Sequence, residues 1–215
     1  MEPELEKHFR KLIRKYGREK HPLEYGNLYQ LLVMVVLSAQ DSDANINRIA
    51  PQFFAIFPDV QSLAAASADA VIPYVSKVRG HRKKVAWLLD IASVLKTNEA
   101  IPLKMEELVK LKGIGRKSAN VIMREAGVRP EGIMVDLHVL RVMSRIGVSK
   151  AETGDKMERD LMAMFPKKMW KDIGMAASFL GREICRPTNP HHQACVMNNI
   201  CEFCLSRQEI TPPPI

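Results

Sequence analysis

The sequence has no hydrophobic run long enough to cross a membrane. Its longest apolar stretch is Leu31–Leu37 (LLVMVVL), whereas a membrane-spanning helix needs about 20 apolar residues. The first residues, Met1–Gly17, alternate charged and apolar side chains and have no apolar core followed by a cleavage site, so we expect no secretory signal. With 47% hydrophobic and 26% charged residues, the composition excludes a disordered or collagen-like chain. We expect a soluble, intracellular protein.

Cysteine is absent from most of the chain. The first is Cys185, and all four lie between it and Cys204. A structural disulfide framework would distribute cysteines across a small secreted chain. A tight group in an intracellular protein instead indicates a metal site.

Acidic residues are outnumbered by basic ones. Lys and Arg total 32 against 24 Asp and Glu, which gives a net charge of +8 and an isoelectric point near 9.4. This excess favours a polyanionic partner, nucleic acid first and a membrane surface second. A generic basic surface explains the composition equally well.

Period-two alternation, the signature of a half-buried strand, is also missing, so we predict an all-α fold. Pro51 predicts a break or kink in the third helix. The Gly- and Pro-containing segment 127–134 is the best candidate for a crossing between domains. Helices are predicted over residues 4–16, 28–39, 43–57, 69–78, 83–95, 105–111, 116–126, 137–146, 156–165 and 169–184.

A glycine-rich turn separates two of the predicted helices. Residues 111–121 read LKGIGRKSANV. Gly113 and Gly115 allow a positive φ and a close approach of the backbone to another molecule, and the free N–H groups at the start of the second helix can bind an anion. Ile114 is expected to insert into the core. An ordinary tight turn between helices would require the same glycines.

Two charged residues near this turn have both a chemical and a simple structural interpretation. Lys117 lies in the first turn of the second helix, where the helix dipole disfavours a positive charge. Asp136 precedes the apolar helix LHVLRVMSRIG and is a good N-cap. From the residues alone, a solvated lysine and a plain helix cap explain both positions.

LKGIGRKSANVIM followed by VDLHVLRVMSRIG closely resembles the endonuclease III branch of the helix-hairpin-helix DNA glycosylases. The resemblance extends from about Leu31 through LSAQDSDANIN (residues 37–47) and GREIC to Cys204. It implies base-excision repair by a bifunctional DNA N-glycosylase/AP lyase that removes oxidised pyrimidines and cleaves 3′ to the abasic site by β-elimination. The implied partner is damaged double-stranded DNA. We expect a monomer, without a membrane partner, in the cytoplasm, at the nucleoid or in another intracellular compartment that holds DNA.

The resemblance also assigns roles to residues. Lys117 matches the nucleophilic lysine, Asp136 the essential aspartate and Gln40 the glutamine that enters the space left by the flipped base. His138 lies in the family's V-D-x-H stretch. The implied fold has two α-helical lobes and a C-terminal cysteine-rich metal-cluster loop: a six-helix barrel of residues 24–129 carrying the hairpin, and a discontinuous lobe of residues 1–23 plus 130–215.

One departure from the family concerns the loop where endonuclease III places a leucine wedge into the duplex. Here Gly80 occupies that place, flanked by Arg79, His81 and Arg82. A glycine cannot fill the base stack, so intercalation would come from Gln40 and from His81 or Arg79. The basic cluster would otherwise contact phosphates or remain a solvated loop.

The second departure concerns the metal motif. The family spacing C-x6-C-x2-C-x5-C, which holds a [4Fe-4S] cluster, falls here on Cys185, His192, Cys195 and Cys201, with an extra Cys204 nearby. We therefore predict a cluster held by the four cysteines. Ligation by His192 in place of Cys204, a zinc site and a metal-free loop are the alternatives.

Two other functions remain open at this level. One is a mismatch- or AP-site-directed relative with an altered lesion preference, which Gly80 favours. The other is a non-catalytic DNA-binding module that uses only the hairpin. The presence of both Lys117 and Asp136 argues against this module, because phosphate binding requires neither residue.

Overall fold

The computed structural model describes residues 3–208, and every regular element in this range is helical. The predicted all-α fold is confirmed. The chain forms two compact units, one of His21–Val128 and one that combines Met1–Lys20 with Arg129–Ile215. Among the described residues, no helix is both long and apolar enough to traverse a bilayer.

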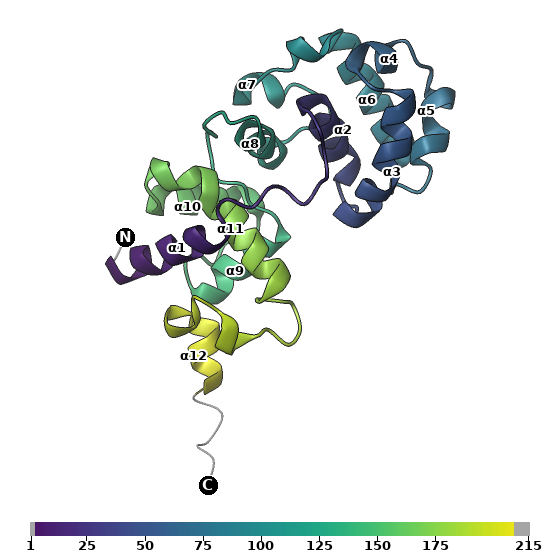
Figure 1. Cartoon of the computed structure of the whole chain (residues 1–215). Helices are drawn as coiled ribbons and strands as arrows, with labels where there is room; N and C mark the ends of the chain where they lie inside the picture. Colours follow the sequence, from purple (N-terminus) through teal and green to yellow (C-terminus); the bar gives the residue numbers. More distant parts are fainter. Residues whose placement is uncertain (1–2, 209–215) are drawn as a thin grey trace. The chain divides into compact units, whose positions relative to one another are not determined.

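The unit of residues 21–128 is built around helix α2 (Leu28–Ser38), which is buried from Leu31 through Leu37. Asn27 starts this helix by accepting a hydrogen bond from the backbone N–H of Gln30 at 2.9 Å. Helix α2 contacts α3, α6 and α8 (Figure 1), so an apolar helix surrounded by others forms the core. The remaining elements of this unit are α3 (Asp43–Ile56), α4 (Val60–Ala64), α5 (Ala68–Val75), α6 (His81–Leu95), the 3₁₀ helix η1 (Asn98–Ala100), α7 (Met105–Leu108) and α8 (Arg116–Glu125).

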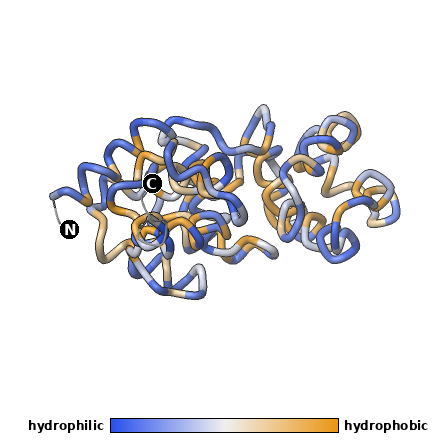
Figure 2. The backbone as a smooth tube through the Cα atoms, turned by 90° about the horizontal axis from the view of Figure 1, so that it is seen from below, coloured by the Kyte–Doolittle hydropathy of each residue, from blue (hydrophilic) through white to orange (hydrophobic). Residues whose placement is uncertain are grey.

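The other unit is organised by helix α11 (Trp170–Glu183), which packs against α1 (Pro3–Tyr16) and α9 (Leu137–Ile146). A Cβ atom at Gly181 would lie 2.8 Å from Cβ of His138, so glycine permits the close approach of α11 to α9. In Figure 2 the hydrophobic segments of each unit gather on its inside. The remaining elements are α10 (Gly154–Met164), η2 (Lys167–Met169), η3 (His192–Ala194), η4 (Asn198–Ile200) and α12 (Glu202–Gln208).

The helix predictions differ clearly from the structure at five helices. Helix α7 ends at Leu108 rather than at residue 111. Helix α3 includes Pro51, so the predicted break is wrong, whereas the alternative of a kink stays a prediction. Helix α5 ends at Val75, and Val78 lies in the following turn. Helices α4 and α12 were not predicted, because each is too short for its hydrophobic periodicity to be read. A capping box between Asp59 and Ser62 stabilises α4 locally.

Candidate active site

The glycine-rich turn connects α7 to α8 as a tight hairpin. Gly113 adopts a φ of +82°, and the N–H of Ile114 donates to the carbonyl oxygen of Leu111 at 3.1 Å. The Ile114 side chain is only 4% exposed, as expected for a residue that anchors the turn in the core. The backbone of the hairpin, rather than its apolar side chain, is therefore the part available to a ligand.

Helix α6 supports the hairpin through a contact that the sequence did not reveal. A Cβ atom at Gly113 would lie 2.6 Å from Cε3 of Trp87, so the indole ring packs directly on the glycine backbone. Lys112 Nζ also lies 2.7 Å from Oδ1 of Asp90, an exposed ion pair that contributes little. The glycine at residue 113 was a sequence signal for a close contact. The sequence could not identify Trp87 as the partner, because it lies far from Gly113 in the chain.

We expect Gly113→Ala to disrupt the hairpin. The new methyl group would collide with Trp87 and would hold alanine at a left-handed φ, which costs about 1–2 kcal/mol by itself. Gly127→Ala is the matched control, because Gly127 also has a positive φ (+78°) but nothing within 4 Å of the added Cβ. Thermal melting should show a larger loss of stability for Gly113→Ala than for Gly127→Ala. DNA-binding titrations should show a loss of affinity for Gly113→Ala alone. Equal affinities of the two variants would contradict this account of the hairpin.

Lys117 is the second residue of α8 and its side chain is exposed. Within residues 21–128, its ammonium group makes no hydrogen bond or ion pair. The helix begins at Gly115, which has no side chain to cap the first-turn N–H groups. Uncapped N–H groups at a helix start bind anions, so an exposed amine lies next to a place suited to phosphate.

Asp136 belongs to the other unit, where both of its carboxylate oxygens are engaged. Oδ1 accepts the N–H of Val139 at 2.8 Å, which makes Asp136 the N-cap of α9. Oδ2 accepts the hydroxyl of Ser178 at 2.6 Å and lies 3.8 Å from Nη2 of Arg182. A plain cap would not need the contacts from α11. The carboxylate is thus held as an oriented negative charge, and its side chain remains 13% exposed.

The other predicted site residues have different surroundings. Gln40 is exposed just after α2 and has a φ of +58°, a backbone conformation that residues other than glycine rarely adopt. His81 is half-buried, and its Nδ1 lies 3.2 Å from the carbonyl oxygen of Val78. His138 faces Arg141, with 3.2 Å between Nδ1 and Nη2. Gln40 is therefore the most accessible of the three.

The four cysteines lie near the C-terminal end of the unit that contains α9 and α11. Cys201 and Cys204 are buried, Cys185 and Cys195 are half-buried, and none is in a disulfide. Burial first, and then the charges of the three other cysteines, raise the pKa of the Cys195 thiol to about 11. The sulfurs are therefore close enough to influence one another. A cation would relieve this repulsion, because ligating thiols must lose their protons.

Arg145 ties the beginning and the end of the cysteine loop together. Its guanidinium donates to Cys185 Sγ at 3.4 Å and to the carbonyl oxygens of Arg186 and Pro187 at 2.7 and 2.9 Å. The thiol of Cys201 donates to the Arg145 carbonyl oxygen at 3.2 Å. A cation fixed against a ligand sulfur is the kind of outer contact that orients metal ligands. The sequence analysis missed this residue.

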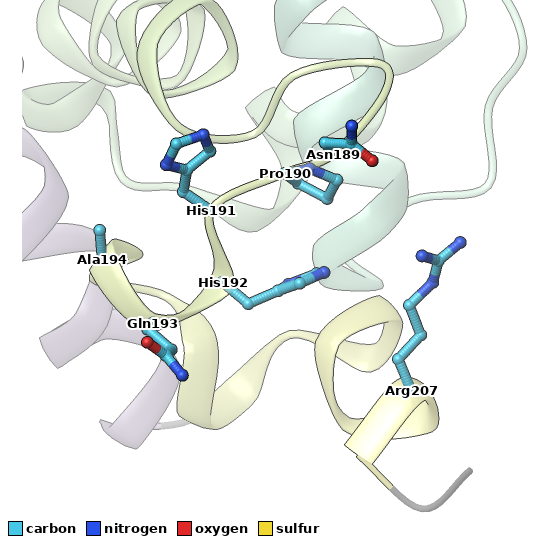
Figure 3. Close-up of a pocket in the computed structure, with 7 residues that line it drawn as sticks. All are labelled: Asn189, Pro190, His191, His192, Gln193, Ala194 and Arg207. Atoms are coloured by element: carbon cyan, nitrogen blue, oxygen red, sulfur yellow. The ribbon is translucent and has the colours of Figure 1, made fainter. Parts of the chain in front are cut away.

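His192, the residue at the family's second cysteine position, is half-buried beside the ring of Phe203, with the ring centroids 5.8 Å apart. In residues 3–208, its buried Nε2 has no hydrogen-bond partner. It lines a pocket of about 610 Å³ together with His191 and Arg207, and in Figure 3 the rings of the two histidines point in different directions.

The donor set fits a thiolate-bound metal centre in chemistry and in number. Four cysteine sulfurs suit either a [4Fe-4S] cluster or zinc, and Cys204 provides the fourth without any imidazole. In residues 3–208, no three His, Cys, Asp or Glu side chains are arranged as a finished coordination site. The four cysteines therefore suit such a centre by their chemistry, and binding one would require a different arrangement of these side chains.

Sequence comparisons agree with the motifs. Residues 33–167 match the HhH-GPD superfamily of base excision DNA repair proteins. Endonuclease III of Thermotoga maritima is 29% identical over 196 residues, which cover 90% of each chain. Endonuclease III of Synechocystis sp. is 32% identical over 83% of each chain.

Solved structures show the same likeness. The chain is similar to endonuclease III in a non-covalent complex with DNA, with a TM-score of 0.85 and 27% identity over 96% of this chain and 97% of that one. A thermostable thymine-DNA glycosylase shares the fold with a TM-score of 0.77 at 16% identity. The predicted enzyme class, DNA glycosylase/AP lyase, is confirmed. The chain belongs to the HhH-GPD superfamily of base excision DNA repair proteins.

Proposed function

We propose that this enzyme removes oxidised pyrimidines from double-stranded DNA and cleaves the strand 3′ to the resulting abasic site. The observation that carries the proposal is the ammonium group of Lys117, which is exposed beside the hairpin and makes no hydrogen bond or ion pair within residues 21–128. The chain also belongs to a superfamily of base excision DNA repair proteins. A damaged base pairs weakly, so it can be extruded from the duplex at a low cost. The hairpin N–H groups and the basic surface supply the phosphate contacts that hold the backbone during extrusion.

Lys117 is the proposed nucleophile. As the free amine, Nζ attacks C1′ of the extruded nucleotide, and the glycosidic bond breaks with its electron pair leaving on the base. Loss of a proton and opening of the sugar give a Schiff base between Nζ and C1′. The Schiff base acidifies the C2′ hydrogens, so elimination breaks the C3′–O3′ bond and releases the 3′ strand. A water-dependent glycosylase would form no such covalent adduct.

Asp136 is the proposed electrostatic group. Its carboxylate is fixed by Val139, Ser178 and Arg182, so its negative charge is oriented before DNA binds. Such a group stabilises the positive charge that develops on the sugar as the base leaves. The three contacts hold the carboxylate in one orientation, which favours the electrostatic role over that of a general base.

Duplexes containing one thymine glycol, one 5-hydroxycytosine or one G·T mismatch test the substrate class. We expect base release and strand cleavage on the two oxidised pyrimidines, and slower or no release from the mismatch and from undamaged DNA. Faster release of thymine from the mismatch would instead support the mismatch-directed alternative. Tight binding without release from any duplex would support a non-catalytic module.

We propose further that Cys185, Cys195, Cys201 and Cys204 hold a [4Fe-4S] cluster that shapes the C-terminal loop. The purified protein should absorb near ~400 nm and contain about four irons per chain. Cys204→Ser should lower the iron content and destabilise the protein, whereas His192→Ala should retain the cluster. The opposite pair of results would assign ligation to His192. One zinc in a colourless protein, isolated without oxygen, would rule out the cluster.

A further inference from the structure

A groove of about 620 Å³ lies between the end of α1, η2 and the start of α11. All three elements belong to the same unit of the chain. The charged side chains that line the groove are Arg10, Arg14, Arg18, Lys168 and Asp172. Arg14, Arg18 and Lys168 are exposed, and within the described residues of this unit none of them makes a hydrogen bond or ion pair. Even with Arg10 paired to Glu6, the groove carries an excess of positive charge.

The groove and Asp136 lie on different sides of helix α11. On one side, the hydroxyl of Ser178 donates to Asp136 at 2.6 Å. On the other side, Asp172 lies beside Gly17, where an added Cβ atom would be 3.1 Å from the Cβ of Asp172. The helix turns through about 600° between Asp172 and Ser178, so the two side chains project about 120° apart. A duplex engaged at Asp136 therefore approaches a different side of the unit from the one that holds the groove.

The residues that line the groove favour a phosphate backbone over an acidic peptide. A guanidinium fork matches two phosphate oxygens, and a lysine adds a point charge. An amphipathic peptide would need apolar pockets for its anchoring side chains. The apolar side chains in the groove offer little surface of this kind, because Met169 is only 4% exposed and Ile13 is half-buried. DNA is also the polymer on which base excision repair proteins act, so it is the polyanion nearest to the bound enzyme.

We propose that the groove binds the phosphate backbone of a second DNA duplex while the first is engaged at Lys117 and Asp136, an inference that rests on the proposed function for the position of the first duplex. Contacts to phosphates carry no sequence information, so any undamaged segment suits the groove. In a long DNA molecule, a second segment is held close to an enzyme that is already bound to the first, which raises its effective concentration. An enzyme that holds both segments can pass from one to the other without leaving the DNA.

A covalent complex isolates the groove from the active site. Wild-type protein is trapped with borohydride on a short unlabelled abasic duplex, purified, and titrated with a fluorescent undamaged duplex. We expect the trapped complex to bind this second duplex, with an affinity that falls as the salt concentration is raised. A groove variant should bind it about tenfold more weakly, and the steepness of log Kd against log salt should decrease by about 2.7, or about 0.9 for each lost contact. The groove variant combines Arg14→Gln, Arg18→Gln and Lys168→Gln.

A control variant removes three exposed positive charges that lie outside the groove: Lys96→Gln, Lys104→Gln and Lys156→Gln. It should bind the second duplex like the wild type, and both variants should cleave the first duplex at the wild-type rate. Equal binding by the groove and control variants, or no binding of a second duplex to the trapped wild type, would overturn the proposal. Tighter binding of poly-glutamate than of the duplex would also overturn it, in favour of an acidic protein partner.

Two further measurements keep the outcomes separate. If thermal melting shows that the groove variant is unstable, the single substitutions Arg18→Gln and Lys168→Gln, both at exposed side chains, provide the test. If no adduct can be trapped, the proposed function is contradicted, and sedimentation velocity of non-covalent complexes then tests the groove. Two short undamaged duplexes per wild-type chain and one per chain of the groove variant support the groove, whereas one for both proteins overturns it.

Discussion

Lys117→Gln should abolish strand cleavage at abasic sites and the borohydride-trapped adduct, a loss of roughly 10³-fold or more, as is typical when a nucleophile is removed. The substitution keeps a similar length and polarity but removes the amine. Because the side chain is exposed at the start of α8, folding and DNA binding should change little. Cleavage of a labelled abasic duplex and gel detection of the adduct measure the effect.

Lys110→Gln is the matched control. Lys110 is also exposed and precedes the hairpin, so this variant removes the same positive charge without removing the proposed nucleophile. It should still form the adduct. Undiminished trapping by Lys117→Gln would show that another amine carries out the chemistry.

Asp136→Asn should slow base release by roughly a hundredfold or more, as expected for the loss of a positioned electrostatic group. Asparagine caps a helix nearly as well as aspartate, so Oδ1 can still accept the N–H of Val139. The amide can also remain hydrogen-bonded to Ser178. Single-turnover rates, compared with thermal melting curves, separate the loss of charge from a loss of stability.

Ser178→Ala provides the comparison for this prediction. It removes one of the contacts that orient Asp136 but leaves the negative charge, so the rate should fall less than in Asp136→Asn. If Asp136→Asn keeps the wild-type rate, the residue is only a helix cap. A larger loss in Ser178→Ala than in Asp136→Asn would show that orientation, rather than charge, is what matters.

The helices and the hairpin could be predicted because their signals are local. Each of these signals spans only a few residues of the sequence. They are the apolar run of α2, the glycines on either side of Ile114, and the N-cap at Asp136. Helix α12 could not be predicted, since its short sequence lies among the cysteines and has little periodicity. The break predicted at Pro51 is absent, because packing around a helix can compensate for the hydrogen bond that a proline removes.

The contacts that define the candidate site are non-local, so the sequence does not identify the partners. Three contacts join residues that lie far apart in the sequence: Trp87 against Gly113, Ser178 against Asp136, and Arg145 against Cys185. Lys117 and Asp136 themselves were found by resemblance to a family, because a lysine in a helix and an aspartate cap are unremarkable by local rules. Their roles stay predictions until chemistry is measured.

The most direct measurement is to identify the residue that the enzyme attaches to DNA. Wild-type protein is reduced with borohydride on an abasic duplex, digested, and the modified peptide is sequenced by mass spectrometry. The account predicts a single adduct on Nζ of Lys117. An adduct on any other residue, or strand cleavage without any adduct, would contradict it.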